Sequence, residues 1–372
     1  MEQHFMLMEP KVQILLPSEN KSDVVRLRTE LPVTVIIPAY NEENTISQTL
    51  DSLKNQTGHV EQIIVVDDYS TDKTGQIAAQ YDGVTVLRPP SNTGSKAGAQ
   101  TFALPNVTSK YTIAIDADTS LEPDAIEKMV KFMDLNPETA AASSFVLPKK
   151  ARTLWERGRY LEYMFVFTFT KKIQEWYGKP LISSGCFSIY NTEELKKIGG
   201  WNKRTLAEDV DLTWTLYENG KVVRYNHEIF CYPLEPENLD MMSKQLRRWS
   251  HGYLQNVKLH WKRIKRVPVI REQIIVSMSD SVFGPLALFV VLPVISILLH
   301  NPLLIAFAFL TDALFISIPP LVKSIKMKNT KMVLGSIPSY FVLRTVNAFF
   351  FWSAFMKEFV LNKSFHMYEK GH

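Results

Sequence analysis

Cysteine is scarce in this sequence, which has two cysteines, Cys186 and Cys231, among 372 residues. A small secreted fold stapled by disulfides needs a denser set, and a structural zinc site needs cysteines or histidines in closely spaced pairs. The sequence therefore indicates neither class. We expect both thiols to be reduced, on a domain that faces the cytoplasm.

Two nucleotide-binding motifs are also missing. No Gly-x-Gly-x-x-Gly follows the first predicted strand, and no Walker lysine motif occurs. These absences argue against a dinucleotide dehydrogenase and against a P-loop enzyme. The net charge of +4 is too small to indicate a nucleic-acid partner, and we expect none. The basic residues between 244 and 271 fit a membrane surface better.

The first residues, "MEQHFMLMEPKVQILLP", have neither a basic start nor a long apolar run. They predict neither a signal peptide nor a membrane anchor. Residues 1–31 are polar and charged, and we expect them to form an extension ahead of the folded domain.

Long apolar runs are present only near the end of the chain. Residues 282–299 are eighteen residues without a charge, 302–322 are interrupted by Asp312, and 332–356 are interrupted by Arg344. Eighteen or more apolar residues are enough for a helix to cross a bilayer. We therefore predict about three transmembrane helices within 271–372, with a buried helical hairpin of a soluble protein as the alternative.

Charges inside and between these runs predict how they are arranged. A single aspartate and a single arginine are costly in lipid, so we expect Asp312 and Arg344 to face the bundle interior and one another. The segment 323–331, "KSIKMKNTK", has four lysines and no acid, which is typical of a cytoplasmic loop. The preceding domain is then cytoplasmic too, at the plasma membrane of a prokaryote.

Residues 32–270 show a different pattern. Short β-branched runs at 33–38, 62–66, 84–87 and 111–115 are typical of strands that are buried on both faces. Between the first two runs, Ile46, Leu50 and Leu53 recur at helical spacing after Asn41, a predicted N-cap. Strands alternating with helices predict an α/β fold with a mostly parallel sheet.

Polar residues follow these strands, where ligands bind in such sheets. Asp116 and Asp118 end the fourth strand in "DAD", and "DDYSTD" follows the second. Two such carboxylates can hold Mg²⁺ or Mn²⁺ against a diphosphate. The alternative is a solvated turn, because Asp-x-Asp by itself is common.

A second acidic cluster, "LAEDVDLTW", occupies residues 206–214 and contains Glu208, Asp209 and Asp211. A carboxylate here can take the proton from an attacking hydroxyl group. The alternative is an acidic helix start, which the helix dipole also favours.

The stretch 244–252, "KQLRRWSHG", lies in a predicted interface helix, 239–265. Gln245, Arg248 and Trp249 share one face of it, because residues three and four apart are neighbours on a helix. Arginine is seldom buried without a partner, so this face is suited to a polar ligand. In the alternative, Trp249 anchors the helix at lipid headgroups. A second amphipathic stretch, 154–178, predicts either an interface helix or a core helix.

These motifs in this order resemble the family 2 inverting glycosyltransferases, in particular membrane-embedded synthases of cellulose, hyaluronan and poly-N-acetylglucosamine. The resemblance rests on "PAYNEEN", "DDYSTD", "NTGSKAGA", "DAD", "SSGCFSIY", "LAEDVDL" and "QLRRW". It implies a GT-A type domain that binds a nucleoside-diphosphate sugar, usually a uridine diphosphate sugar. Tyr69 departs from the pattern, since glycine is common at its position.

The resemblance also implies a role for each matching residue. Asp209 would be the catalytic base beside Glu208, and Asp116 and Asp118 would hold the nucleotide and the divalent metal. The nucleotide sugar would contact Pro38, Ala39, Tyr40, Glu42, Asp67, Asp68, Lys96, Asp116, Ala117, Asp118, Gln245 and Arg248. The acceptor would contact Gly185, Cys186 and Trp249.

The sequence does not distinguish between two kinds of acceptor. A growing polysaccharide at the membrane is one hypothesis, and a lipid that receives a single sugar is the other. A membrane-bound nucleotide-sugar sensor without activity is a third, which the complete set of acids disfavours. Oligomers are compatible with every one of these readings.

Overall fold

The computed structural model describes residues 30–366. The predicted extension 1–31 lies outside the described residues, except that Glu30 and Leu31 begin the first strand. One mixed sheet has the strand order β3-β2-β1-β4-β7-β6-β8-β5. The strands are β1 Glu30–Ala39, β2 His59–Asp67, β3 Val84–Leu87, β4 Tyr111–Ile115, β5 Ser120–Leu121, β6 Thr139–Val146, β7 Phe187–Asn191 and β8 Val222–Tyr232.

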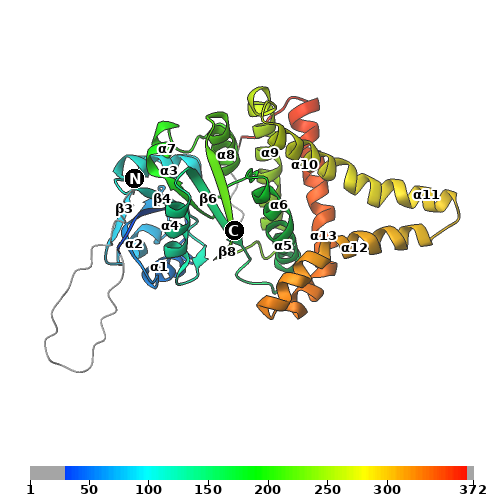
Figure 1. Ribbon diagram of the computed structural model, residues 1–372, viewed down its shortest axis with the longest axis horizontal. Coiled ribbons are helices and arrows are strands. Elements are labelled where there is room, and N and C mark those ends of the chain that lie inside the picture. Colours follow the sequence, from blue (N-terminus) through cyan, green and yellow to red (C-terminus); the bar gives the residue numbers. More distant parts are fainter. Residues whose placement is uncertain (1–29, 367–372) are drawn as a thin grey trace, which may run out of the picture.

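Helices cover both faces of this sheet and continue beyond it (Figure 1). In the sheet region they are α1 Ile46–Lys54, α2 Thr74–Ala78, α3 Lys96–Ala103, α4 Ala125–Leu135, α7 Thr192–Lys197 and α8 Glu208–Glu218. Beside and beyond it are α5 Leu154–Phe165, α6 Lys171–Trp176, α9 Leu239–Ile264, α10 Pro268–Leu286, α11 Leu292–Leu298, α12 Leu303–Met327 and α13 Thr330–Phe355. Short helical turns are η1 Leu104–Asn106, η2 Val166–Thr170, η3 Ala287–Val291 and η4 Met356–Val360.

The four strands that the sequence predicts are β1 to β4, and they form the parallel half of the sheet. Their side chains alternate between two buried layers. Val35 and Ile37 pack with α1 and α4, whereas Ile36 and Ile64 pack with α3 and α8. The other half is mixed, because β7 runs antiparallel to both β4 and β6. The predicted α/β architecture is confirmed, with a sheet that is mixed rather than mostly parallel.

The start of α1 differs from the prediction. Asn41 is not its N-cap: the residue before the helix is Thr45, and Asn41 has a left-handed backbone with φ 54°. The chain turns sharply out of β1, and Asn41 Oδ1 accepts a hydrogen bond from the Thr71 amide at 2.9 Å. Asn41 therefore joins two loops at the sheet edge. Sequence spacing alone does not distinguish this role from a helix cap.

The amphipathic stretch at 154–178 forms α5, the π-helical turn η2 and α6 in succession. α5 begins with a capping box between Thr153 and Glu156 and is buried between the sheet and α13. Gly158 permits the close crossing, because a Cβ at this position would lie 2.9 Å from the Ser339 carbonyl oxygen. α5 is thus largely buried, while the end of the stretch exposes 80% of Trp176, and the interface-helix role of the stretch stays a prediction.

Two helical segments within the described residues are long and apolar enough to cross a membrane, Pro268–Leu298 and Leu303–Met327. They project away from the sheet as a hairpin (Figure 1), and only 22% and 17% of their most apolar windows are buried. The structure therefore does not bury this hairpin in a core. The third predicted span, 332–356, is helical as α13 but is not one of these two segments, so its membrane crossing remains a prediction.

The two charges in the apolar runs meet as expected. Arg344 of α13 forms an ion pair with Asp312 of α12. A second carboxylate, on Asp280 of α10, lies 4.0 Å from the same guanidinium group. These contacts link the three helices α10, α12 and α13.

Candidate active site

A cavity of about 560 Å³ lies between the sheet edge and the C-terminal helices. It begins at the carboxyl end of β4, passes the start of α8 and one face of α9, and reaches α10 and α13. Many of the predicted site residues line it: Lys96, Asp116, Asp118, Gly185, Cys186, Glu208, Asp209, Gln245, Arg248 and Trp249. The fold thus brings together motifs that are far apart in the sequence.

Other predicted site residues do not line this cavity. They are Pro38, Ala39, Tyr40, Glu42, Asp67, Asp68 and Ala117. Buried Asp67 accepts from the Ser70 amide at 2.9 Å and from Arg88 at 2.7 Å. Asp68 accepts from the amide and hydroxyl of Thr93 at 2.8 and 2.9 Å. Both carboxylates thereby hold the loops after β2 in place.

Tyr69 lies between these two loops with a left-handed φ of 68°. Glycine adopts this region without steric cost, which explains why a glycine is common at this position in the family that the sequence resembles. Here the ring is half exposed, and the Arg88 guanidinium lies 5.1 Å from its centroid. The cation–π contact partly offsets the backbone strain.

Lys96 connects the acids of the cavity. It is the first residue of α3, which Ser95 caps by accepting from the Gly98 amide at 3.2 Å. Its ammonium group pairs with Asp116, lies 3.3 Å from Glu208 and donates to the Gly185 carbonyl oxygen at 3.0 Å. A cation with three acceptors from different elements compensates part of the local negative charge.

Asp209 lies in the first turn of α8, and two amides orient its carboxylate. The Gly185 amide donates to Oδ2 at 3.0 Å, and the Val210 amide donates to Oδ1 at 2.9 Å. A Cβ at residue 185 would lie 3.0 Å from Lys96 Nζ and 3.4 Å from Asp209, so glycine permits the close approach. Burial and neighbouring Glu208 raise the pKa of Asp209 to about 6. A carboxylate with this pKa is ionised at neutral pH and is suited to general-base chemistry.

Asp211 belongs to the same acidic cluster but serves a different purpose. It accepts from Arg204 at 2.7 Å and contacts His260 at 2.8 Å, and it does not line the cavity. His260 also contacts Glu218 at 2.7 Å, which ties α8 to α9. This segment therefore contains both a structural acid at the helix start, Asp211, and the candidate base, Asp209.

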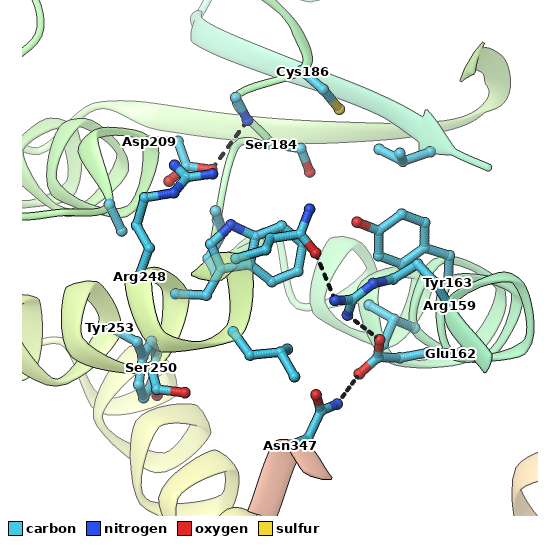
Figure 2. A pocket seen from close by; sticks show the side chains of 18 of the residues that line it. Arg159, Glu162, Tyr163, Ser184, Cys186, Asp209, Arg248, Ser250, Tyr253 and Asn347 are labelled. Carbon is cyan, nitrogen blue, oxygen red and sulfur yellow. Dashed lines mark hydrogen bonds and ion pairs between the residues drawn. The ribbon is translucent and has the colours of Figure 1, made fainter. Parts of the chain in front are cut away.

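The face of α9 that carries Gln245, Arg248 and Trp249 is held by Arg159 of α5. The Arg159 guanidinium donates to Gln245 Oε1 at 2.7 Å and lies 4.6 Å from the centroid of the Trp249 ring. Arg248 extends from α9 toward Asp209 in Figure 2. Arg159 therefore engages Gln245 and Trp249, while Arg248 lies at the catalytic end of the cavity.

Arg159 is one of five charged cavity residues that no sequence motif indicated, together with Glu162, Lys171, Glu235 and Asp280. Arg159 pairs with Glu162, and Asn347 of α13 donates to Glu162 at 2.9 Å (Figure 2). Burial raises the pKa of Glu235 to about 7, although Arg159 lies 3.3 Å away. Arg159, Glu162 and Lys171 lie in the amphipathic stretch at 154–178, and the charges of that stretch are the sequence feature that could have indicated them.

The donor set fits a hard divalent cation that substrate phosphates help to hold. Asp116 and Asp118 both line the cavity, and the described residues contain no group of three or more histidine, cysteine, aspartate or glutamate side chains suited to a metal. Mg²⁺ is commonly bound by one or two carboxylates plus phosphate oxygens. Two carboxylates are therefore sufficient if a diphosphate completes the coordination.

Both cysteines are free thiols, as expected. Cys186 lines the cavity, and its Sγ lies 3.8 Å from Sγ of buried Cys231. The contact with Cys231, together with burial, raises the pKa of the Cys186 thiol. This thiol is therefore protonated at neutral pH, and it borders the site as a neutral side chain.

Comparisons with known proteins agree with this geometry. The model of the family described as glycosyl transferase family 2 matches residues 34–199. A poly-beta-1,6-N-acetyl-D-glucosamine synthase of Staphylococcus epidermidis is 25% identical over 223 residues, which cover 59% of this chain and 54% of the relative. The synthase of Staphylococcus aureus strain MSSA476 is 24% identical over 238 residues, which cover 63% and 58%. The chain thus spans little more than half the length of these relatives.

Among solved structures, a mannosyltransferase from Pyrobaculum calidifontis in complex with GDP-Man and Mn²⁺ has the same fold. The TM-score is 0.59 at 19% identity, with 89% of this chain and 88% of that chain covered. This likeness concerns the fold alone. The motifs, the matched region and the synthase relatives agree with one another: residues 34–199 match the glycosyl transferase family 2 model, and the chain is similar to the polysaccharide synthases among its relatives.

Proposed function

We propose that this chain transfers a sugar from a uridine diphosphate sugar to a growing polysaccharide at a membrane, with inversion at the anomeric carbon. The observation that carries the proposal is the single cavity, which joins Asp116, Asp118 and Asp209 to Arg248 and Trp249. One end has the acids suited to an activated sugar. The other end opens among the helices that follow the catalytic domain.

In the proposed reaction, Asp209 removes the proton from an acceptor hydroxyl group. The hydroxyl oxygen attacks the anomeric carbon as the bond from that carbon to the diphosphate oxygen breaks. Gly185 and Val210 fix the direction of the carboxylate through their amides. Arg248 offers its guanidinium group to the departing diphosphate, which charge-assisted hydrogen bonds stabilise.

Asp116 and Asp118 would hold Mg²⁺ or Mn²⁺, which neutralises negative charge on the diphosphate when it is bound. Lys96 pairs with Asp116. The same ammonium group lies between Asp116 and Glu208, where it limits the repulsion between these carboxylates. Lys96 is thus placed to contact the phosphates or their counter-ion.

The loops after β1 and β2 would form the outer part of the nucleotide site. Tyr40 is exposed, and it lies next to the Asp67 and Asp68 loops through Asn41 and its hydrogen bond to Thr71. In this proposal the uracil and ribose contact the rim of these loops. Asp67 and Asp68 shape the rim through their internal hydrogen bonds.

The acceptor would reach Asp209 from the side of the C-terminal helices. The cavity wall there includes Ser277 and Asp280 of α10 and Asn347 of α13, which offer hydrogen-bonding groups to hydroxyls. Trp249 supplies an aromatic surface on which a sugar ring can pack. The exposed apolar hairpin would lie in the membrane, with the catalytic domain on the cytoplasmic side.

The proposal is tested by sizing the product. Membranes that contain the full chain are incubated with a panel of labelled uridine diphosphate sugars and Mg²⁺ or Mn²⁺. We expect nucleotide release together with a polymeric product for one donor. A discrete product that extracts into organic solvent would instead establish the lipid acceptor. Absence of nucleotide release from every donor would refute the transferase proposal and leave the sensor.

A further inference from the structure

Lys171 is a buried lysine to which the proposed mechanism assigns no role. It begins α6, directly after the π-helical turn η2, and its residue is 6% exposed in the cavity wall. Within residues 30–366, no carboxylate lies at ion-pair distance from its ammonium group. Lysine is rarely buried without such a partner. Its placement therefore calls for a reason.

The ammonium group of Lys171 contacts one short segment of chain. It donates to the Ile182 carbonyl oxygen at 2.8 Å and to the Ser184 hydroxyl oxygen at 2.7 Å. The ring of Phe167 lies under the ammonium group, with its centroid 4.8 Å from Nζ. These contacts fix the position of the charge and hold the segment 182–186.

The same segment orients the candidate base. The Gly185 amide donates to Asp209 at 3.0 Å, while the Gly185 carbonyl oxygen accepts from Lys96 at 3.0 Å. Two lysines, Lys171 and Lys96, thus hold the segment at neighbouring residues. Replacing either lysine would therefore loosen the Gly185 amide that donates to the Asp209 carboxylate.

We propose that Lys171 is a positioning residue for the transfer reaction: it holds segment 182–186 so that the Gly185 amide orients Asp209, and its charge favours the ionised carboxylate. This inference rests on the proposed function, since it needs Asp209 to act as the base. Lys171 itself touches neither donor nor acceptor in this scheme. It acts through the segment and through its electric field.

Lys171 favours the ionised Asp209 carboxylate only while its own ammonium group is charged. The groups that face it are Asp209 of α8, the thiols of Cys186 and Cys231, and the Phe167 and Tyr225 rings. Burial lowers the pKa of Lys171 to about 8. The ammonium group therefore carries its charge at pH 7 and loses it above pH 8, where Asp209 loses a favourable neighbour.

Three substitutions separate the hydrogen bonds from the charge. Lys171→Gln keeps a hydrogen-bond donor without the charge, Lys171→Arg keeps both, and Lys171→Met removes both. Lys172→Met is the matched control, because Lys172 is the next residue and is exposed. Nucleotide release by the full chain in detergent is measured from pH 5 to 9.5, with KM for the donor determined at each pH. Amide hydrogen exchange of the peptide that contains residues 182–188 is measured in parallel.

We expect Lys171→Met to lower kcat roughly 10- to 100-fold with the KM for the donor within about twofold, because the base is misplaced and the donor site is intact. The acid limb of the kcat profile should move to higher pH by roughly one unit in both Lys171→Met and Lys171→Gln. Exchange of the segment should rise in Lys171→Met only. Lys171→Arg should keep its rate above pH 8, where the wild type declines, because arginine stays protonated.

The inference is overturned if Lys171→Met matches Lys172→Met in both kcat and exchange. It is also overturned if kcat falls while the acid and alkaline limbs of the kcat–pH profile stay where they are in the wild type. Lys171 would then contribute to folding alone. If Lys171→Arg does not fold, the Lys171→Gln profile decides the electrostatic part. A wild type that releases no nucleotide from any donor refutes the proposed function, whereas the exchange data still decide whether Lys171 holds the segment.

Discussion

Carboxylates occur in two neighbouring regions of this protein, and the two groups have opposite surroundings. The acids after β2, Asp67 and Asp68, accept hydrogen bonds from amides, a hydroxyl and a guanidinium group within their own loops. The acids of the cavity, such as Glu208 and Asp209, lie close to one another and near Lys96. Carboxylates thus shape a loop in one region and line a cavity in the other.

The difference shows how a site can be distinguished from its scaffold by hydrogen bonding. A carboxylate that accepts hydrogen bonds from several groups of its own loops has few lone pairs left to offer a ligand. A carboxylate with a raised pKa in a cavity retains a reactive oxygen. Asp209 is of this second kind, because burial outweighs its two amide contacts. The following experiments test this distinction.

The largest expected effect is that of Asp209→Asn. We expect kcat to fall by roughly 10²- to 10⁴-fold, since an amide cannot accept the acceptor's proton. Nucleotide binding should stay near the wild-type level in a titration with uridine diphosphate. Asp211→Asn is the matched control two residues along: it should lower thermal stability through its Arg204 and His260 contacts while turnover persists. Near-normal turnover of Asp209→Asn would show that the base is assigned incorrectly.

A smaller loss is expected for Asp118→Ala. Removal of one group that stabilises the leaving diphosphate costs roughly 10²- to 10³-fold in kcat, and the concentration of Mg²⁺ needed for half-maximal rate should rise. A chelator should abolish the wild-type rate. Asp124→Ala is the control, because the Asp124 side chain forms an exposed ion pair with Lys128 on α4 and does not line the cavity. Equal Mg²⁺ dependence in Asp118→Ala and the wild type would remove the metal from the proposal.

The pH profile of the wild type tests the cavity carboxylate directly. The pKa of Asp209 is raised to about 6, so its basic form is lost as the pH falls through 6. Between pH 7 and pH 5, kcat should therefore decrease about tenfold. A kcat that is constant down to pH 4 would place Asp209 among the saturated, loop-shaping carboxylates instead.

The smallest effect on turnover is expected for Asp67→Ala. Ser70 and Arg88 would lose their acceptor, which should lower the free energy of unfolding by about 1–3 kcal/mol. At a temperature where the variant stays folded, kcat should remain within a few-fold of the wild type. Thermal unfolding and donor KM are measured on the same samples. A large rise in KM without a loss of stability would show that Asp67 contacts the nucleotide.

Much of the scaffold could be predicted from local patterns. The four apolar runs became β1 to β4, and the predicted helix 239–265 appears as α9, Leu239–Ile264. Burial on both faces selects β-branched residues, and a helical face repeats every three or four residues, so both patterns are visible in sequence. The pairing of Asp312 with Arg344 followed from the cost of single charges among apolar residues.

The contacts that orient the site could not be predicted in the same way. Nothing in the sequence links Arg159 to Gln245 and Trp249, because they meet only when α5 packs beside α9. Local spacing does not distinguish Asp209 from Asp211 either, since both follow the same helix start, and only the resemblance to a known family pointed to Asp209. Their roles separate because one points at Gly185 and the other at His260.

The sequence by itself determined the four strands β1 to β4, which helices are apolar, and that acids gather at the strand ends. Those properties depend on neighbours within a few residues, and side-chain periodicity records them. Only the tertiary structure decided which acids remain available in the cavity, that Arg159 occupies one side of Trp249, and that Lys171 lies against the segment that orients Asp209. Such choices depend on the packing of elements distant in the chain, where small displacements change every hydrogen-bond partner.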